Sequence, residues 1–390
     1  MWPANRGSNA NIMKIIFTGG GTAGHFYPII AVVEALNVIA RKHKLLNLKY
    51  YFLSENPYDE RALFENQIEF RRVRAGRLRR YFSWRIIPDF FQTGIGIIEA
   101  IIKLYAIYPD LVFCKGGYAS FPVVVSARLF RIPIFVHESD SRPGRVNYFA
   151  ARRATRIAVS YPEVITFFPE KKRSVAAVTG NPIRHDLLYP LTAGAREFLD
   201  LESNLPIVYV TGGSQGAAII NEILLDILPT LLGKCQVVHQ VGENNLKEVK
   251  QRASVVLEKS SFRARYKPVG FLNSSAIRMV AGASALVVSR AGSSIFEFAQ
   301  WGLPAILIPI PESISHDQRT NAFTYARSGG ATVIEQGNLT PSVLQSEIFR
   351  LLNNQELLAT MRVGAKSFAR PDAAEKIAAE ILSIIVSHEK

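Results

Sequence analysis

Cysteine is scarce in this chain of 390 residues, which contains only Cys114 and Cys235. The two lie far apart, and each stands in an apolar run typical of a buried strand. Two distant cysteines cannot build the dense disulfide framework of a small secreted domain. We therefore expect both thiols to be buried and reduced, as in a cytosolic protein.

Long apolar runs are missing as well. The first twelve residues contain no apolar stretch of the kind found in a secretory signal. The most apolar region, 84–108, is interrupted by Pro88, Asp89, Glu99 and Lys103. It falls short of the ~20 apolar residues that span a bilayer. The sequence therefore predicts a protein that does not cross a membrane.

Basic residues, by contrast, are in excess. The chain has 46 Lys and Arg against 32 Asp and Glu, a formal net charge of +14. Such a surplus favours an anionic partner, which can be nucleic acid, an acidic membrane face or a phosphate-rich substrate.

Short β-branched or aromatic runs alternate with longer stretches of helical spacing, which predicts parallel sheets covered by helices on both faces. The expected strands of the first half are 14–17, 48–53, 110–114, 132–138 and 155–160. Those of the second half are the beginning of 206–224, and 235–241, 285–289, 305–310 and 331–335. The pattern of 14–36, a strand, a glycine turn and a helix, returns at 206–224. The fold class is therefore α/β with two doubly wound domains, 13–184 and 185–371, and a C-terminal helix, 372–387, that packs back on the first.

The first glycine turn matches the dinucleotide pattern G-x-G-x-x-G at Gly19, Gly21 and Gly24. A nicotinamide site needs an acidic residue about twenty positions later to hold the ribose. The nearest candidate, Glu55, comes roughly ten positions too late for that role. His25, directly after the last glycine, is also foreign to the pattern. The loop is therefore expected to bind a phosphate other than that of NAD.

The second half carries the residues of a nucleotide-sugar site. Ser214 follows a glycine turn, and Ser293 opens a helix whose first turns carry Glu297. A carboxylate there can accept hydrogen bonds from two ribose hydroxyls while the helix N-terminus faces a diphosphate. Asp317 and Gln318 follow as short polar groups suited to sugar hydroxyls.

With these residues the chain resembles the peptidoglycan N-acetylglucosaminyltransferases of glycosyltransferase family 28, over about residues 14–385. The matching motifs are "GGGTAGHFYP" (19–28), "KGGYASFPVVVSA" (115–127), "IPIFVHESD" (132–140), "GNPIR" (180–184), "GGSQGA" (212–217), "SRAGSSIFE" (289–297) and "HDQRTNA" (316–322). The resemblance implies the two-domain GT-B fold. It also implies transfer of GlcNAc from UDP-GlcNAc to the 4-hydroxyl of MurNAc in lipid I, giving lipid II, without a cofactor or a bound metal.

The resemblance assigns site residues to both substrates. The donor residues it implies are Thr22, Gly24, Asp140, Arg184, Ser214, Leu272, Ser293, Glu297, Asp317 and Gln318. The acceptor diphosphate is expected at Gly20, Gly21, Gly116, Gly117 and Tyr118.

The catalytic base is expected to be His25, because its loop faces the cleft and an unperturbed imidazole titrates near neutral pH. Glu138 and Asp140 are the alternatives. Asp140 departs from the asparagine found in some family members, and it can accept a hydrogen bond from a sugar hydroxyl but not donate one.

The lipid acceptor implies a peripheral protein on the cytoplasmic face of the cell (inner) membrane. The segment 70–91 supplies the residues expected at an acidic membrane surface, Arg77, Arg79, Arg80, Phe82 and Trp84. Binding of nucleic acid is not expected, because no nucleic-acid module accompanies these arginines. Two alternatives stay open, a related GT-B glycolipid synthase such as a diacylglycerol glycosyltransferase, and a non-catalytic membrane scaffold that binds sugar nucleotides.

Overall fold

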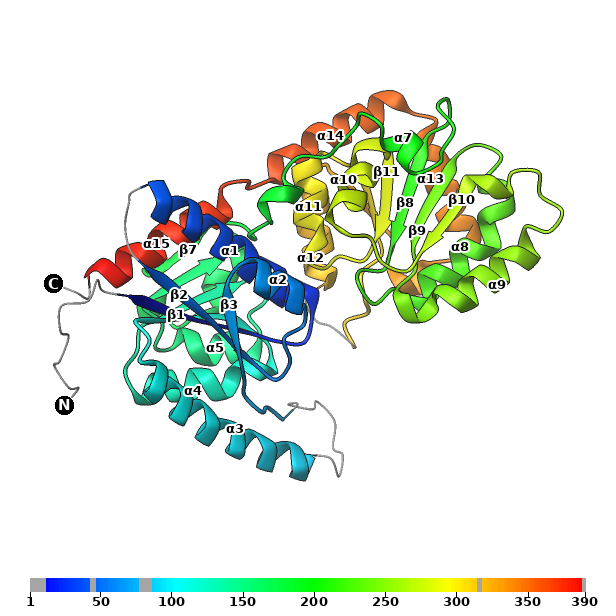
Figure 1. Cartoon of the computed structure of the whole chain (residues 1–390). Coiled ribbons are helices and arrows are strands. Elements are labelled where there is room, and N and C mark those ends of the chain that lie inside the picture. Colours follow the sequence, from blue (N-terminus) through cyan, green and yellow to red (C-terminus); the bar gives the residue numbers. More distant parts are fainter. Residues whose placement is uncertain (1–11, 43–46, 77–85, 314–317, 388–390) are drawn as a thin grey trace. The chain divides into compact units, whose positions relative to one another are not determined.

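The computed structural model describes residues 12–42, 47–76, 86–313 and 318–387 of the chain. They form two compact units (Figure 1). The first unit consists of residues 1–184 and 372–390, and the second of residues 185–371. The chain therefore leaves the first unit, builds the whole of the second, and returns.

The described part of the first unit is built on a parallel sheet in the order β3-β2-β1-β4-β5-β6-β7. Its strands are β1 (Met13–Gly19), β2 (Leu48–Ser54), β3 (Ile68–Arg72), β4 (Leu111–Gly116), β5 (Ile134–Glu138), β6 (Arg156–Val159) and β7 (Ala176–Val178). Its helices are α1 (Ala23–Lys42), α2 (Glu60–Glu65), α3 (Ile86–Ile107), α4 (Phe121–Leu129), α5 (Arg145–Ala151), α6 (Glu170–Arg173) and α15 (Ala373–Ser387).

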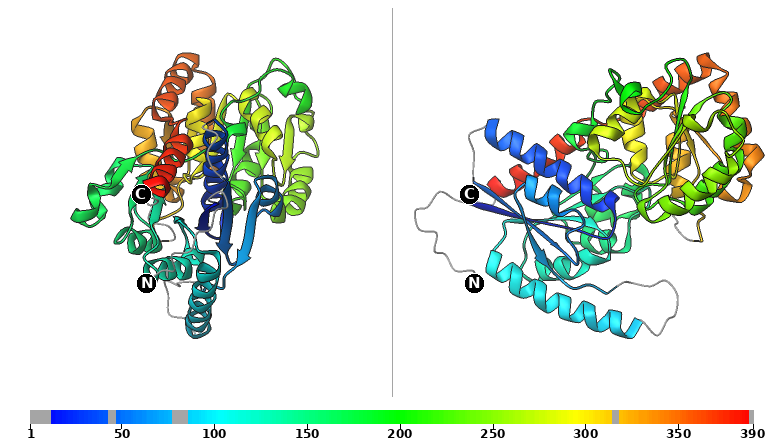
Figure 2. Two further views of the ribbon diagram at one scale, coloured as in Figure 1. Left: turned by 60° about the vertical axis from the view of Figure 1, so that its left-hand side comes forward. Right: turned by 45° about the vertical axis from the view of Figure 1, so that its right-hand side comes forward.

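Helices cover both faces of this sheet (Figure 2). On one face α1 and α15 pack together on β1 and β4, with Phe17, Ile29 and Ile377 buried in one core. On the other face α3, α4 and α5 bury Leu104, Val123 and similar side chains. Because both faces are covered, the central strands are apolar on both sides, as the continuous apolar runs of the sequence predict.

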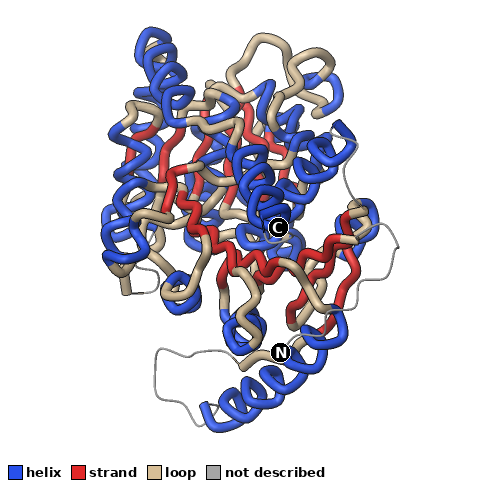
Figure 3. The backbone as a smooth tube through the Cα atoms, turned by 90° about the vertical axis from the view of Figure 1, so that its left-hand side faces the viewer, coloured by secondary structure: helices blue, strands red, loops and turns tan. Residues whose placement is uncertain are grey.

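The described part of the second unit repeats this plan with a parallel sheet in the order β10-β9-β8-β11-β12-β13. Its strands are β8 (Ile207–Thr211), β9 (Gln236–Gln240), β10 (Tyr266–Val269), β11 (Leu286–Ser289), β12 (Ala305–Leu307) and β13 (Ala331–Val333). Its helices are α7 (Ala195–Phe198), α8 (Ala218–Leu231), α9 (Leu246–Val256), α10 (Ser274–Ala283), α11 (Ser294–Trp301), α12 (Gln318–Arg327), α13 (Pro341–Leu352) and α14 (Gln355–Phe368). Figure 3 shows the strands of both units in red and the helices in blue.

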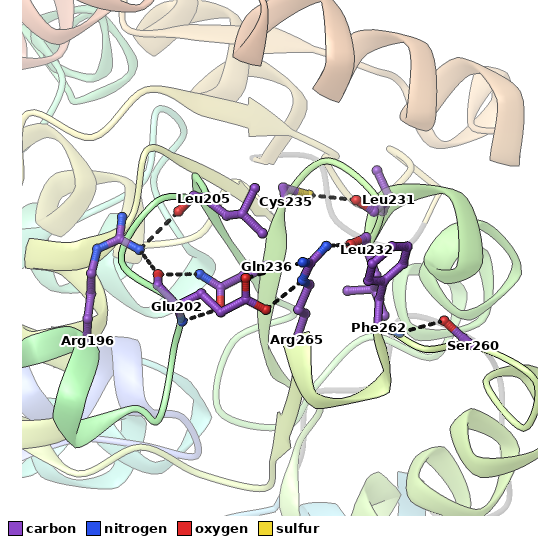
Figure 4. Close-up of polar contacts among 10 residues, drawn as sticks. All are labelled: Arg196, Glu202, Leu205, Leu231, Leu232, Cys235, Gln236, Ser260, Phe262 and Arg265. Carbon is purple, nitrogen blue, oxygen red and sulfur yellow. Dashed lines mark hydrogen bonds and ion pairs between the residues drawn. The ribbon is translucent and has the colours of Figure 1, made fainter.

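Polar side chains at the amino edge of the second sheet form a network of hydrogen bonds (Figure 4). Arg265 donates to both carboxylate oxygens of Glu202, at 2.7 and 3.2 Å, and to the Leu232 carbonyl at 2.8 Å. The Gln236 amide pairs with the backbone of Glu202 through bonds of 2.8 and 2.9 Å. These mutually satisfied groups fix the segment that enters β8, and no donor here is aimed at a ligand.

Cys114 and Cys235 are buried free thiols, as expected. Burial raises the pKa of each thiol to about 12, so both are unreactive at neutral pH.

Two described helices are long and apolar enough to cross a bilayer, namely α1 and the part of α3 from Pro88 to Ile107. By this measure the expectation that no such stretch exists is wrong. Half of the α1 stretch is buried, as in the core helix of a soluble domain, whereas only 22% of the α3 stretch is buried. Apolar side chains of α3 therefore remain on the surface of the first unit.

Candidate active site

The first unit has its topological switch point between β1 and β4, the two strands from which the chain order runs in opposite directions. Ligands of open α/β sheets bind at the carboxyl ends of the strands flanking this point. The turn after β1 contains Gly20 and Gly21, and the turn after β4 contains Gly116 and Gly117. All four glycines expected at the acceptor diphosphate therefore lie at the switch point.

These two turns touch through positions that only glycine can occupy. A Cβ on Gly20 would lie 2.5 Å from the Ala119 Cβ, and one on Gly117 would lie 2.9 Å from the Gly20 carbonyl oxygen. Gly21, Gly116 and Gly117 also have φ values of +82°, +93° and +83°. The close approach concentrates backbone N–H groups at one place, which is the usual design of a phosphate site.

Tyr118 follows the second turn and is hydrogen-bonded to the residue that follows β2, two strands away from β4 in the sheet. Its hydroxyl donates to Glu55 Oε2 at 2.7 Å. Glu55, which lies too late in the sequence for a nicotinamide ribose, thus orients a tyrosine beside the glycine turns.

His25 lies in the first turn of α1, with Thr22 and Gly24 directly before it. Its Nδ1 is 2.9 Å from the Thr22 hydroxyl. Burial and the charge of Lys115 lower the pKa of His25 to about 3, against a hydrogen bond to the Gly20 backbone that raises it. The expectation of a near-neutral pKa is therefore wrong. The imidazole is thus neutral throughout the physiological pH range, and with this pKa it binds a proton only weakly.

Glu138 ends β5 and is almost fully buried. Its Oε1 accepts from the Asp140 N–H at 3.0 Å. Its Oε2 accepts from the Gly144 N–H at 2.9 Å and from Asn147 Nδ2 at 2.9 Å. Both oxygens are therefore engaged in shaping the turn that carries Asp140, which is only partly buried.

The buried carboxyl of Glu138 titrates far from its usual range. Burial and the Asp140 charge raise its pKa to about 7, while the Asn147 and Asp140 hydrogen bonds and the Lys115 charge act in the opposite direction. Glu138 therefore binds a proton more readily than His25, although both of its oxygens already accept hydrogen bonds from N–H donors.

Arg184 is the last residue of the first unit before the chain enters the second. Its guanidinium lies 4.2 Å from the centre of the Tyr27 ring on α1. The aromatic face positions this cation on the first unit.

The second unit has its switch point between β8 and β11. The turn after β8 carries Ser214. Two other positions in this turn, Gly212 and Gly216, can be occupied only by glycine. A Cβ on Gly212 would lie 2.2 Å from the Ala217 N, and one on Gly216 would lie 1.9 Å from the Val241 carbonyl oxygen. The turn leads into α8, whose N-terminus has no side-chain cap.

The turn after β11 leads into α11 in the same way, with Ser293 at the N-cap position and again no side-chain cap. In the same unit α10, α13 and α14 are capped by Asn273, Thr340 and Asn354, whereas α7 and α9 also lack a side-chain cap. The helices at the switch point thus keep N–H groups that a ligand can use. Glu297 lies in the first turn of α11, and its charge reaches the buried Tyr209 of β8.

Two further donor residues lie at the same edge of the sheet. Gln318 begins α12, and its Oε1 accepts from the Ile310 N–H at 3.2 Å. Its Nε2 would lie 3.9 Å from a Cβ on Gly292, so it stands beside the α11 turn. Leu272 follows β10 and is buried just before α10.

Several expected residues lie outside the described residues. They are Asp317 in the donor group, and Arg77, Arg79, Arg80, Phe82 and Trp84 in the membrane group.

Sequence reasoning did not single out Lys115 or Asn147. Lys115 is buried beneath the first glycine turn, and Asn147 bridges Glu138 to the His137 carbonyl, 3.1 Å away. Lysine is ordinarily a surface residue, and nothing in the sequence places the α5 asparagine beside β5. Within the ranges that the structure describes, no group of three or more His, Cys, Asp or Glu residues is arranged to hold a metal ion.

Comparisons with known proteins agree with this geometry. Residues 15–159 match the glycosyltransferase family 28 N-terminal domain, and residues 207–377 match the family 28 C-terminal domain. A UDP-N-acetylglucosamine–N-acetylmuramyl-(pentapeptide) pyrophosphoryl-undecaprenol N-acetylglucosamine transferase of Treponema denticola is 34% identical over 341 residues, 84% of this chain and 85% of the relative. The enzyme of the same name from Shouchella clausii is 34% identical over 372 residues, 94% of this chain and 99% of the relative.

Solved structures share the fold. The crystal structure of MurG from Acinetobacter baumannii has a TM-score of 0.69 at 22% identity, covering 96% of this chain and all of that one. UDP-GlcNAc 2-epimerase from Neisseria meningitidis, bound to UDP-GlcNAc, has a TM-score of 0.66 at 15% identity, covering 95% of this chain. Since both domain models match in order, and curated relatives are one-third identical over most of their length, the chain belongs to glycosyltransferase family 28.

Proposed function

We propose that the chain transfers GlcNAc from UDP-GlcNAc to the 4-hydroxyl of MurNAc in undecaprenyl-diphosphate-linked lipid I, and so forms lipid II. The observation that carries this proposal is that the switch point of each unit has glycine-restricted turns, namely those after β1 and β4 in the first unit and the one after β8 in the second. Two anion sites suit a donor and an acceptor that each contain a diphosphate. The names of the relatives supply the identities of both substrates.

The donor belongs to the second unit in this proposal. The uncapped N-termini of α8 and α11 face the diphosphate, with the Ser214 and Ser293 hydroxyls beside it. Glu297 accepts from the ribose hydroxyls, and Gln318, with Asp317, binds the GlcNAc hydroxyls. The Leu272 backbone meets the uracil, and Arg184 adds a cation to the diphosphate.

The acceptor belongs to the first unit. Its diphosphate rests on the N–H groups of the turns after β1 and β4, and His25 receives the proton of the attacking hydroxyl. The acceptor oxygen forms a bond with C1 of GlcNAc while the bond from C1 to UDP breaks. UDP leaves with the electron pair, and the in-line attack inverts the anomeric centre. Asp140 orients a sugar hydroxyl near the reacting atoms.

The acceptor's lipid requires contact with a membrane, and the surface of α3 supports one. An apolar line of side chains, the α3 stripe, is between 42% and 71% exposed. It consists of Phe91, Ile95, Ile98, Ile102 and Tyr105. The opposite face of the helix buries Ala100 and Leu104 in the core, so α3 is apolar on both sides.

Basic residues accompany the α3 stripe. Figure 1 shows α3 lying along α4, and the two helices are in contact. Burial lowers the pKa of Arg128 in the last turn of α4, and the nearby charges of Arg153 and Arg152 lower it further. An apolar stripe on a unit that also carries clustered arginines complements an acidic membrane face. We therefore propose that the protein binds peripherally to the cell membrane, on the cytoplasmic face.

Turnover is the test of this function. Purified protein is incubated with radiolabelled UDP-GlcNAc and a short-chain lipid I analogue, and the disaccharide product is identified by mass spectrometry. Parallel reactions receive diacylglycerol or no acceptor. Formation of GlcNAc-MurNAc product supports the proposal. Glycosylation of diacylglycerol alone, or binding of UDP-GlcNAc without transfer to any acceptor, would overturn it.

A further inference from the structure

Lys115 is a buried lysine without a partner. Its side chain is 1% exposed, and its Nζ makes no hydrogen bond. Buried lysines are rare and are almost always paired, because an ammonium ion loses its hydration when it is removed from water. An unpaired one therefore has a cost in stability that the protein's activity must explain.

The lysine stem runs beneath the first glycine turn. A Cβ on Gly19 would lie 3.3 Å from the Lys115 Cβ and 3.2 Å from the His25 carbonyl oxygen. Lys115 thus lies under the first turn of α1, where the helix dipole is already positive. The ammonium adds a second positive charge at the switch point of the first unit.

The surrounding groups do not neutralise this charge by contact. Cys114 pairs in register with Val136, so Lys115 lies beside His137 on the next strand. His137 Nε2 is 3.0 Å from the Gly180 carbonyl and must donate to it, which leaves Nδ1 as a buried acceptor without a partner. The oxygens of Glu138 are occupied by N–H donors.

The charges that act on Lys115 belong to residues of its own strand, β4, and of β5 and the turn that follows β5. Burial lowers its pKa to about 8, while Glu138, Asp140 and Cys114 act in the opposite direction. Lys115 in turn helps to lower the pKa of His25 and of His137, in each case after burial. Each of these groups interacts with the ammonium through a poorly hydrated interior, where charges act over longer distances than in water.

We propose that Lys115 is a buried counter-charge for the acceptor's diphosphate. The phosphates bind the N–H groups of the turns, and the lysine stabilises them from below without touching them. This inference rests on the proposed function, since it concerns the same acceptor site. It makes Lys115 a positioning residue whose charge, which Glu138 and Asp140 oppose only from a distance, gains the diphosphate as a further counter-charge when the acceptor binds.

The test compares two lysine variants. In Lys115→Met the stem is retained and the charge is removed. Lys14→Met is the matched control, because Lys14 is also on a strand of this sheet but its Nζ is paired, donating to the Ile107 carbonyl at 2.8 Å. We expect Lys115→Met to raise the acceptor KM by ~10-fold or more, the scale of one charge-assisted interaction. The KM for UDP-GlcNAc should stay within about twofold, a margin far below one such interaction.

Stability separates this role from a structural one. Replacing an unpaired buried charge by an apolar side chain of similar volume is usually neutral or stabilising. The Tm of Lys115→Met should therefore equal or exceed that of the wild type, whereas that of Lys14→Met should fall. A fall in Tm for Lys115→Met as large as that of the control would overturn the inference.

Two further measurements test the inference in other ways, namely the affinity for pyrophosphate and the pH dependence of the acceptor KM. Calorimetry with inorganic pyrophosphate, at saturating UDP to fill the second unit, should show binding to wild type and at least ~10-fold weaker binding to Lys115→Met. The wild-type acceptor KM should also rise above pH 8 as Lys115 loses its proton, and that of the variant should not. Equal pyrophosphate affinity would overturn the inference even if GlcNAc transfer is intact. Absence of transfer in the wild type, with pyrophosphate binding that depends on Lys115, would instead refute the proposed function alone.

Discussion

Proton transfer in the proposed reaction depends on the imidazole of His25. The sequence predicts its place in a glycine turn, because three glycines before a helix define that turn locally. It does not predict the pKa of about 3, which arises from tertiary burial and from a lysine ninety residues later in the chain. The same holds for Lys115 and Asn147, whose roles depend on strand order rather than on neighbours in sequence.

Replacing His25 by Asn should lower kcat by about 10² to 10⁴, the usual contribution of a general base. The neutral imidazole is the form that accepts a proton, and its lowered pKa keeps it neutral well below pH 6. We therefore expect wild-type kcat/KM to show no decline between pH 7 and pH 5 that belongs to His25. Stopped assays of kcat/KM across this range check this.

A decline in kcat/KM below about pH 7 would contradict the assignment of His25 as the base if the Glu138→Gln variant did not show that decline. That result would identify the buried carboxyl, whose pKa is raised to about 7, as the base.

Glu297 gives a second prediction at the scale of one residue. If its carboxylate accepts from both ribose hydroxyls, Glu297→Ala should lose about 2–4 kcal/mol of transition-state binding, measured as kcat/KM for UDP-GlcNAc. Glu248→Ala, on the exposed surface of α9, is the control and should have normal kinetics. Normal kinetics for Glu297→Ala as well would refute the ribose assignment.

At the scale of elements, the sequence predicts the central strands and the edge strand β13 but misses the other three edge strands. The missed strands, β3, β7 and β10, all lie at edges of the two sheets. An edge strand is half exposed, so its residues need not form an apolar run, and β10 even contains Pro268, which an edge tolerates. Part of the basic segment expected at the membrane, Arg71 and Arg72, belongs to β3.

The α3 stripe supports a prediction about this element. The triple variant Phe91→Ser, Ile98→Ser and Ile102→Ser should bind acidic liposomes at least ~10-fold more weakly, since each buried apolar side chain contributes about 1.5–3 kcal/mol when fully inserted. Turnover on a water-soluble acceptor should be unchanged, and turnover on the undecaprenyl acceptor in bilayers should fall. Val255→Ser with Val363→Ser, both exposed in the second unit, is the control. Equal losses on both acceptors would place α3 in the active site or the fold instead.

The helix N-termini of the second unit lead to a prediction about metals. If α8, α11 and Arg184 balance the charge of departing UDP, the reaction needs no divalent cation. Initial rates should be the same with and without EDTA. Complete inactivation that Mg²⁺ or Mn²⁺ reverses would show that these groups do not suffice.

At the scale of the whole molecule, the first unit is discontinuous in sequence, since α15 completes its core after the second unit ends. Ile381 is fully buried there, whereas Val386, near the end of the same helix, is 39% exposed. Ile381→Ala should lower the free energy of unfolding of the first unit by about 2–5 kcal/mol, as for other large-to-small core changes.

The measurement is hydrogen exchange of β1 and β4 amides, which reports on the first unit separately. Val386→Ala, in which the same kind of group is removed from a partly exposed site, should change protection by less than about 1 kcal/mol. Equal effects of the two variants would mean that α15 is not part of this core.

Because the chain returns to its first unit, the ribosome synthesises the sheet of that unit long before the helix α15 that covers it. The sheet strands β1 to β7 emerge early, but the helix that covers one of their faces is made last. At ~5–20 residues per second, synthesis of the intervening second unit takes roughly 10–40 s. During that time Phe17, Ile29 and their neighbours have no α15 to cover them, so the nascent first unit presents an apolar face to chaperones. The unit that is translated second is therefore the first that can finish folding.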